Sequence, residues 1–372
     1  MRKGIGLIML GLMLCSLALC SCSPEMAGKA GGLAPSDTLA AAKTPAMTAA
    51  PVSTPMPTES PTPVPPPTQE PTPTPTPSPT PDPWAGIFHP GGAYVSVKDF
   101  TKGPWIYKDE TLSVKIKYTR AGTCNRTCYI AEVYARGPLF RRGFAFQSDK
   151  GKTELPYKIA RRYDAVLGIT ADYFNHRSNR KGVMLQDGKV YHDKQKNSTL
   201  AILPDGELKV ISPGKTNAES LIGLGVKDSF AFGPILVSDG KINQKSIKDH
   251  WLSSKATEYR AAVGMIEKGH YIVIVTKGSF TMQQLAQVFV DYKCTVAYNM
   301  DGGHSACMIF MGEQLNHPFP SEINGQRQRP LPDLMMIGTH PAVPDVKDKV
   351  YCDGVNVRSK NRPKPTDGLL KP

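Results

Sequence analysis

A short polar run, Asn299–Ser305, holds the side chains best suited to chemistry, in the order Asn-Met-Asp-Gly-Gly-His-Ser. It continues from Thr295–Met300, an apolar stretch with the composition of a buried strand. Asp301 is therefore expected at a strand end, followed by two glycines that let the backbone bend and a ligand approach closely. Sites in α/β proteins usually lie at such strand ends. Asp-Gly-Gly is also typical of a hairpin turn, and the residues alone leave that alternative open.

A second polar run, Asp172–His176, follows another apolar stretch, Ala165–Thr170. It brings a carboxylate, an amide and an imidazole together directly after a buried strand. Asp172, Tyr173 and Asn175 are therefore candidate site residues. The alternative is a polar loop whose two aromatic residues fill the core.

One arginine, Arg260, stands at the head of the apolar run Ala261–Gly264. Its planar guanidinium could hold a phosphate through two parallel hydrogen bonds. The alternative for a lone arginine is a surface charge. The segment Phe232–Lys241 is typical of a strand followed by a turn, and by itself carries no chemistry.

The remaining patterns predict the elements that must position these residues. Alternation of apolar and polar side chains predicts strands over Thr111–Tyr118 and Cys128–Tyr134. The clearest helix is Thr281–Tyr292, where Thr281 can cap the first turn and Gln284 completes a capping box. The other expected elements are a helix over Leu155–Arg162 and strands over Ala165–Thr170, Thr199–Leu203, Pro234–Val237, Tyr271–Thr276 and Thr295–Met300. The order predicts an α+β or α/β fold: a mixed β-sheet flanked by helices, in a single globular domain.

Taken in chain order, these pieces resemble the phosphodiester glycosidase family. The motifs that carry the resemblance are Thr170–Phe174, Gly233–Gly240, Arg260–Gly264, the helix from Thr281, and Asn299–Ser305. Each motif alone is weak, and their order together with the last motif makes the resemblance specific. It implies a hydrolase that acts on sugar-1-phosphodiesters. One departure bears on substrate specificity and activity: the family carries Asn-Gly where this chain has Thr170-Ala171.

The resemblance also implies roles for the site residues. Such a hydrolysis must stabilise an oxocarbenium-like centre while a phosphate monoester departs, and two carboxylates can divide this work. We expect these carboxylates to be Asp301 and Asp172. Arg260 would neutralise phosphate charge, and His304 would donate to a phosphate oxygen or act as an acid. The other expected contacts are the backbones of Gly302 and Gly303 and the side chains of Tyr173, Asn175, Asn299 and Ser305. The sequence requires no cofactor and leaves open a divalent metal held by Asp301 and Asp172.

The N-terminus has the features of an export signal. Arg2 and Lys3 precede an apolar stretch, Ile5–Leu19, that is too short for a stable membrane span. A small residue, Ser21, then precedes Cys22, as in bacterial lipoprotein signals. We expect cleavage before Cys22 and lipidation of that residue, which would anchor the chain on the extracellular face of the bacterial cytoplasmic membrane. The alternative is an ordinary signal peptide that contains cysteine.

A proline-rich spacer follows the signal. Of the 34 prolines in the chain, 16 lie between Pro45 and Pro83. Proline removes backbone donors, so this stretch is expected to be a disordered, extended stalk. The predicted organisation is a signal peptide over 1–22, a stalk over 23–84, a phosphodiester glycosidase-like domain over 85–340 and a basic tail over 341–372.

Charge and cysteine content narrow the class of partner. The chain carries 45 Lys and Arg against 32 Asp and Glu, with the excess on residues 85–372. Outside a cell this balance favours an anionic glycopolymer or a phosphate-bearing substrate. Nucleic acid is not expected, because no basic and aromatic residues interleave as in a binding module.

The cysteines beyond the signal are Cys124, Cys128, Cys294, Cys307 and Cys352. An odd number leaves at least one thiol, and the residues do not decide whether the first two form a disulfide.

Two functions from different classes fit these patterns. The first is an extracellular, membrane-anchored hydrolase that cleaves glycosyl phosphodiesters in cell-wall or exopolysaccharide polymers. The second is a non-catalytic polysaccharide-binding lipoprotein on the same fold, which the Thr170-Ala171 departure favours.

Overall fold

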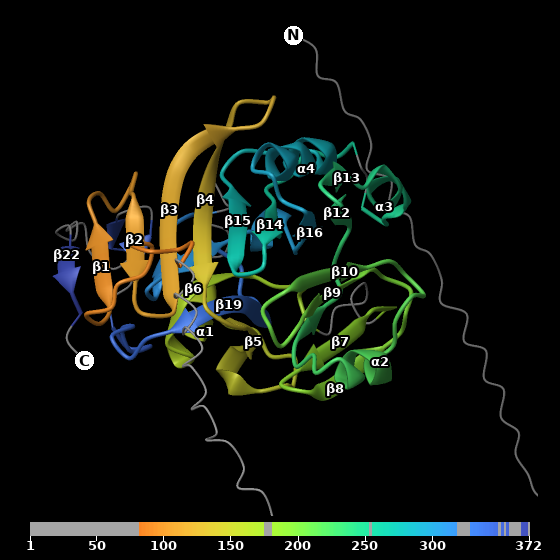
Figure 1. Ribbon diagram of the computed structural model, residues 1–372, viewed down its shortest axis with the longest axis horizontal. Coiled ribbons are helices and arrows are strands. Elements are labelled where there is room, and N and C mark those ends of the chain that lie inside the picture. Colours follow the sequence, from red (N-terminus) through yellow and green to blue (C-terminus); the bar gives the residue numbers. More distant parts are fainter. Residues whose placement is uncertain are drawn as a thin grey trace, which may run out of the picture. The chain divides into compact units, whose positions relative to one another are not determined.

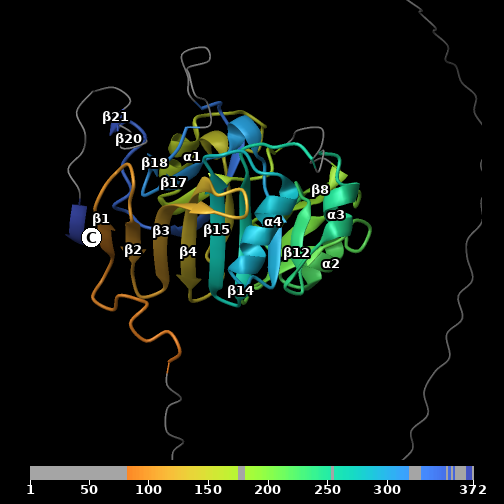
Figure 2. The same ribbon diagram turned by 90° about the horizontal axis from the view of Figure 1, so that it is seen from above.

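Two β-sheets that share one hydrophobic core make up most of the structure. It is a computed structural model that describes residues 82–174, 181–252, 255–317, 328–348, 351–352, 355–356 and 366–370. All of these residues belong to one compact unit, Pro77–Pro372. Figure 1 shows the long β3–β4 hairpin extending beyond its neighbours, and Figure 2 shows β1, β2, β3, β4 and β15 side by side.

The larger sheet has ten strands in the order β13-β12-β16-β14-β15-β4-β3-β2-β1-β22. Its strands are β1 (Tyr94–Val97), β2 (Trp105–Lys108), β3 (Leu112–Ala121), β4 (Arg126–Ala135), β12 (Ile235–Ser238), β13 (Lys241–Ile242), β14 (Ala261–Glu267), β15 (His270–Thr276), β16 (Val296–Asn299) and β22 (Thr366–Leu369). Every neighbouring pair in this sheet is antiparallel.

The second sheet has seven strands in the order β21-β20-β18-β17-β6-β19-β5. These are β5 (Phe140–Phe144), β6 (Ala165–Thr170), β17 (Met308–Phe310), β18 (Glu313–Gln314), β19 (Asp333–Thr339), β20 (Tyr351–Cys352) and β21 (Val355–Asn356). The small sheets comprise β7 (Val183–Gln186) with β8 (Lys189–Asp193), and β9 (Thr199–Ile202) with β10 (Leu208–Ile211) and β11 (Ser229–Phe230).

The helices are short. They are α1 (Pro156–Arg162), α2 (Ala218–Gly223), α3 (Gln244–Asp249) and α4 (Met282–Asp291), with 3-10 turns at Ala145–Gln147 and Gly303–Ser305. Helix α4 begins as predicted: the Thr281 hydroxyl accepts from the N–H of Gln284 at 3.1 Å, and the Gln284 side chain accepts from the N–H of Thr281 at 3.0 Å. None of the helices in the described segments combines the length and apolarity that a membrane crossing requires.

Side-chain alternation explains how the two sheets meet. In β3, Val114 and Ile116 are buried while Lys115 and Lys117 face solvent, as a strand with one covered face requires. The shared core joins such residues to Ile169 and other apolar residues of the second sheet. Helix α4 packs on residues of β14 and β15 in a separate apolar cluster, and α1 packs on residues of β17 and β19 in another.

The predicted fold class is wrong. Among the described residues 40% lie in strands and 14% in helices, in several antiparallel sheets, so this is not a helix-flanked α+β or α/β arrangement. The error has a local source. The β15-α4-β16 segment is a strand–helix–strand unit, but β14 lies between its two strands and pairs antiparallel with both. The prediction assumed that the whole sheet repeats this strand–helix–strand unit, and it therefore expected more helices beside the sheet than the structure has.

The Asp-Gly-Gly run does not form a hairpin. Strand β16 before it pairs with β12 and β14 in the ten-stranded sheet, whereas β17 after it pairs with β6 in the other sheet. A 3-10 turn, Gly303–Ser305, makes the crossing. The chain therefore passes from one sheet to the other at this point, which places Asp301 where the sheets meet.

The two ends of the described fold are also fixed by packing. Near the N-terminal end, the Trp84 ring lies 6.0 Å from the ring of Tyr134, beside the Gly269 turn between β14 and β15. At the other end, β22 pairs with β1, so residues of the predicted tail supply an edge strand.

The four cysteines whose side chains are described, Cys124, Cys128, Cys294 and Cys307, are thiols. Burial raises the pKa of Cys128 and of Cys294 to about 12 in each case, so both side chains are protonated apolar groups at neutral pH.

Candidate active site

A cavity of about 380 Å³ lies where the two sheets meet. It is lined by Tyr173, Phe232, Trp251, Leu252, Glu258, Arg260, Asp301, Gly302, Gly303, His304 and Arg329. Six of these residues were predicted from the sequence as site residues: Tyr173, Arg260, Asp301, Gly302, Gly303 and His304. The fold therefore brings parts of three separate motifs to one cavity.

Asp301 lies just after the end of β16. Its backbone N–H donates to the carbonyl of Ala171 at 2.8 Å. Asp301 is buried, with 7% of its surface exposed. Burial raises the pKa of Asp301, while a hydrogen bond from Ser305 and the charge of Arg329 oppose the rise. Asp301 therefore holds a proton more readily than a free aspartate does.

The glycines after Asp301 allow the turn to pack on the chain that leads into β14. A Cβ at Gly302 would lie 2.6 Å from the carbonyl oxygen of Tyr259. Gly303 has a φ of +53°, and its N–H donates to the same Tyr259 oxygen at 2.7 Å. That N–H is consequently occupied within the protein, although the sequence suggested that it would contact a substrate.

Arg260, at the head of β14, is 2% exposed and held by backbone oxygens. Its Nε donates to Phe280 at 3.0 Å and its Nη2 donates to Ala256 at 2.8 Å. Burial lowers the pKa of Arg260 to about 10, although the nearby Glu258 charge opposes this effect. The guanidinium is therefore still a cation at neutral pH, fixed in place at the wall of the cavity.

A second arginine, Arg329, lies beside Asp301 and was not predicted. Its Nη2 lies 3.2 Å from the Asp301 carboxylate, and its Nε donates to the Ser305 hydroxyl at 2.7 Å. The guanidinium also lies over the Tyr173 ring, 4.6 Å from the centroid. Ser305 is buried behind it. The sequence signal was faint: a basic, polar stretch just before the apolar strand β19.

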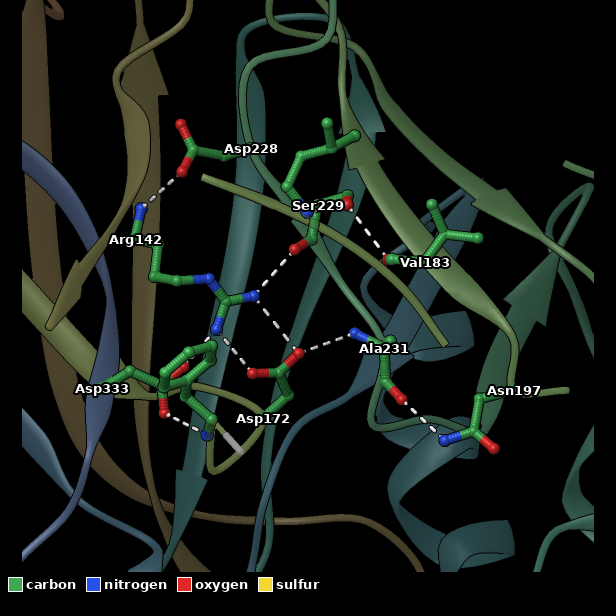
Figure 3. A network of polar contacts seen from close by, with 10 residues as sticks. Arg142, Asp172, Val183, Asn197, Asp228, Ser229, Ala231 and Asp333 are labelled. Atoms are coloured by element: carbon green, nitrogen blue, oxygen red, sulfur yellow. Dashed lines mark hydrogen bonds and ion pairs between the residues drawn. The ribbon is translucent and has the colours of Figure 1, made fainter. Parts of the chain in front are cut away.

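Asp172 is placed away from the cavity, in the polar network of Figure 3. Its side chain has no exposed surface and pairs with Arg142 through Nη1–Oδ1 at 2.5 Å and Nη2–Oδ2 at 3.2 Å. The N–H of Ala231 also donates to Oδ2, at 2.8 Å. The predicted pair of carboxylates, Asp301 and Asp172, thus does not meet in one cavity.

Arg142 joins four segments of the fold, as Figure 3 shows. Besides Asp172 it pairs with Asp333, and its Nη2 donates to the Ser229 carbonyl at 2.7 Å. Burial raises the pKa of Asp333 well above its usual range despite the opposing charge of Arg142. Burial alone would lower the pKa of Arg142, but the two carboxylates raise it overall. The arginine stays charged because its partners supply the compensation that a buried ion requires.

This network holds the backbone that flanks Tyr173. The carboxylate of Asp333 accepts from the N–H of Phe174 at 2.9 Å, and Asp172 is held by Arg142. Tyr173 lies between them and has a φ of +55°, a backbone conformation that residues other than glycine rarely adopt. The network therefore fixes Tyr173 toward the cavity. Sequence reasoning missed Arg142, whose signal is a pair of arginines within the otherwise apolar β5.

The remaining predicted residues have other positions. The side chain of Asn299 is buried and donates through Nδ2 to the Gly233 carbonyl at 2.8 Å. Among the described residues its Oδ1 has no hydrogen-bond partner. His304 is exposed at the cavity. Asn175 lies outside the described residues, as does Cys22.

The departure from the family motif does not face the cavity. Thr170 and Ala171 are both buried, and neither lines the cavity. Ala171 instead receives the N–H of Asp301. The substitution therefore lies behind the carboxylate rather than on the surface that a substrate would touch.

Glu258 supplies a second carboxylate to the cavity. It is exposed, and its Oε2 lies 3.6 Å from the point where a Cβ of Gly303 would stand. Within the described part of the chain its carboxylate has no hydrogen bond or ion pair. The sequence signal was present but unused: an acidic residue two positions before Arg260.

The described residues do not favour the metal site that the sequence left open. No group of three or more His, Cys, Asp or Glu side chains among them is arranged to hold a metal ion. The Asp172 carboxylate is already paired with Arg142, so it cannot join Asp301 at a shared ion.

The comparisons with known proteins bear on this region of the chain. Residues 163–338 match the family model described as phosphodiester glycosidase. The match covers 176 of the chain's 372 residues, just under half. The matched region contains Arg260, Asp301 and Arg329.

Two individual proteins are similar to the chain. The SPbeta prophage-derived uncharacterized protein YomE of Bacillus subtilis (strain 168) is 24% identical over 236 residues, which cover 56% of this chain and 36% of that protein. The chain thus matches about a third of that relative's length. The zebrafish N-acetylglucosamine-1-phosphodiester alpha-N-acetylglucosaminidase catalytic domain, solved in a form auto-inhibited by its pro-peptide, has a TM-score of 0.52 and 19% identity, covering 62% of this chain and 85% of that domain. This second likeness shows the fold.

Proposed function

We propose that the protein is a hydrolase that cleaves glycosyl phosphodiesters. The observation that carries the proposal is the cavity that sets two arginines, Arg260 and Arg329, beside the buried carboxylate of Asp301. Guanidinium groups recognise phosphate, and a carboxylate can stabilise or protonate groups at an anomeric centre. The match of residues 163–338 to the phosphodiester glycosidase family model supports the same reaction class.

In this proposal Asp301 and Glu258 are the two working carboxylates. Asp301 is buried with a raised pKa, which suits an acid, whereas Glu258 is exposed and its carboxylate accepts no hydrogen bond among the described residues, which suits a base. Water attacks the anomeric carbon and gives its proton to Glu258. The carbon–oxygen bond breaks with its electron pair on the phosphate oxygen, which Asp301 protonates. The products are the free sugar and a phosphate monoester, and both carboxylates then exchange protons with solvent.

The arginines act on the leaving group. Arg260 and Arg329 neutralise the negative charge that grows on the phosphate as the bond breaks. Their positions are set before substrate arrives, because backbone oxygens hold Arg260 and Ser305 holds Arg329. His304, exposed at the same cavity, donates to a phosphate oxygen.

The proposed setting comes from the sequence. A lipid on Cys22 would anchor the chain to the outer face of the cytoplasmic membrane, and the proline-rich stalk would carry the domain toward a cell-wall or exopolysaccharide polymer. The basic charge favours an anionic polymer as substrate. Expression of Cys22→Ser beside the unchanged protein tests the anchor. The variant should leave the membrane fraction, and an unchanged distribution would contradict lipidation at this residue.

The activity is tested with the full chain purified in detergent. We would supply α- and β-linked diesters of glucose, galactose and N-acetylglucosamine 1-phosphate and measure the free sugar released. Asp301→Asn and Glu258→Gln should each lower the rate by about 10²-fold or more. Glu219→Gln, at an exposed position on α2, is the matched control and should not change it.

Two outcomes would contradict the proposal. Folded protein that releases no sugar from any diester is one, and release that survives Asp301→Asn is the other. Saturable polysaccharide binding without turnover would favour a non-catalytic binder on the same fold.

A further inference from the structure

The lining of the cavity includes apolar as well as charged side chains. Phe232, Trp251 and Leu252 are its apolar members. Trp251 is 52% exposed, although exposing a large indole to water is unfavourable. Its ring lies 5.8 Å from that of Phe232 at an interplanar angle of 69°. An exposed aromatic residue at the edge of a polar cavity is typical of a ligand-binding surface.

The aromatic pair is held in place by His250. The Leu252 N–H donates to His250 Nδ1 at 3.3 Å, so the ring proton lies on Nε2, which donates to the Phe232 carbonyl at 2.9 Å. Burial lowers the pKa of His250 to about 4, which keeps this neutral form at physiological pH. The same ring lies 5.4 Å from the ring of Trp251.

The backbone at the Phe232 end of this aromatic surface is held by a buried hydrogen bond. Phe232 directly follows Ala231, whose N–H donates to the buried Asp172 carboxylate. The aromatic surface is therefore anchored at Ala231 by the Arg142 network and at Trp251 by His250. A surface fixed before binding loses little entropy when a ligand covers it.

We propose that Phe232 and Trp251 form a subsite for a pyranose ring, namely the glycosyl unit that carries the phosphate. The proposal rests on the proposed function and adds the direction in which the substrate lies. Sugar rings present apolar C–H faces that pack on aromatic side chains, while their hydroxyl groups stay in water. The phosphate then lies at Arg260 and Arg329, and the bond to be cleaved faces Asp301.

Charge argues against the reverse placement. A phosphodiester placed flat against the side chains of Phe232, Trp251 and Leu252 would lose hydration that their C–H groups do not replace. A neutral ring placed between Arg260 and Arg329 would make no use of either positive charge. Both costs favour one orientation, with the sugar ring against the aromatic side chains.

Binding of products tests this orientation without any need for turnover. The chain has three tryptophans, Trp84, Trp105 and Trp251, so its emission is their sum and the difference from Trp251→Phe isolates the signal of Trp251. We would titrate the full chain in detergent with N-acetylglucosamine, with glucose and with inorganic phosphate, and repeat each titration by calorimetry. Trp84→Phe is the matched control, because its ring packs against Tyr134 and Phe88 and not at the cavity.

The expected results separate the apolar from the charged side chains of the cavity. At least one sugar should change the emission, and the change should vanish in Trp251→Phe and persist in Trp84→Phe. By calorimetry Trp251→Ala should weaken sugar binding by about tenfold or more, whereas Trp251→Phe should keep most of it. Phosphate binding should be unaffected by Trp251→Ala and weakened by Arg329→Gln.

Three results would overturn the subsite: no saturable sugar binding by the unchanged protein, equal sugar affinity in Trp251→Ala, or equal loss of sugar and phosphate binding in that variant. These are distinguishable from failure of the proposed function. Sugar binding that depends on Trp251, without hydrolysis of any diester, would contradict the hydrolase and leave the subsite standing. Hydrolysis of a diester by a protein whose sugar affinity does not change in Trp251→Ala would support the hydrolase and contradict the subsite.

Discussion

The backbone N–H of Asp301 donates to the carbonyl of Ala171, and this 2.8 Å bond joins two motifs that lie far apart in the sequence. The residue after Ala171 is Asp172, which Arg142 holds in the core. The position of the cavity carboxylate thus depends on a buried ion pair that a substrate cannot reach. This arrangement gives Asp172 a positioning role.

Replacement of Asp172 separates positioning from catalysis. Asp172→Ala leaves Arg142 with one fewer carboxylate and should lower the free energy of unfolding by about 3–5 kcal/mol, the usual result of breaking a buried pair. Asp172→Asn keeps the shape and should cost less. The folded fraction of Asp172→Asn should hydrolyse diesters within about tenfold of the unchanged protein, unlike Asp301→Asn. Denaturant titration together with kinetics on the folded fraction checks both, and a folded Asp172→Asn without activity would show that the charge of Asp172, and not only its shape, is required for activity.

Gly302 should not tolerate a side chain. A Cβ there would lie 2.6 Å from the Tyr259 carbonyl oxygen, so Gly302→Ala must push apart the turn and the segment that carries Arg260. We expect a loss of about 1–3 kcal/mol in stability and a larger proportional loss of kcat/KM. Gly223→Ala is the matched control, since a Cβ there meets nothing within 4 Å. Equal behaviour of the two variants in thermal unfolding and kinetics would contradict the close approach.

Arg329 should affect both substrate affinity and the pH profile. Arg329→Gln removes a phosphate-binding cation and should raise KM by roughly tenfold or more. It also removes a charge that lowers the pKa of Asp301, so that pKa should rise further. The limb of the kcat/KM profile that reports Asp301 should then move to higher pH. A limb that stays in place while KM rises would separate the phosphate role of Arg329 from its effect on Asp301.

His250 should make the fold sensitive to acid. Its pKa is about 4 in the folded chain against about 6.5 when unfolded, so the unfolded state binds more protons between these values. Stability should therefore fall as the pH drops from about 6.5 toward 4, by at most roughly 3 kcal/mol. His250→Gln keeps a donor for the Phe232 carbonyl and should remove the part of the pH dependence of stability that comes from His250. Urea titrations of both proteins across this range check it, and parallel curves would argue against a buried neutral His250.

Local patterns predicted the individual elements better than their assembly. The capping box at Thr281 and the apolar run Ala165–Thr170 each depend on neighbours in the sequence, and the structure has α4 and β6 there. Sheet order depends on which distant strands pair, which no local pattern contains. The placement of β14 between β15 and β16 therefore escaped prediction, and with it the fold class.

The site shows the same division. Asp301 and Arg260 were predicted because strand ends and chain order point to them, and both line the cavity. Asp172 has the same local signature, but Arg142 from a distant strand takes its carboxylate into the core. Glu258, Arg329 and Trp251 reach the cavity from loops, where spacing carries little information about the direction of a side chain.

Trp84 and Arg260 lie at opposite ends of strand β14. The indole packs by the Gly269 turn that follows the strand, and Arg260 precedes its first residue. Seven extended residues span about 23 Å. The first described residues and the cavity therefore lie near opposite ends of one strand. A label or tether placed beside Trp84 should leave the cavity free to bind a ligand.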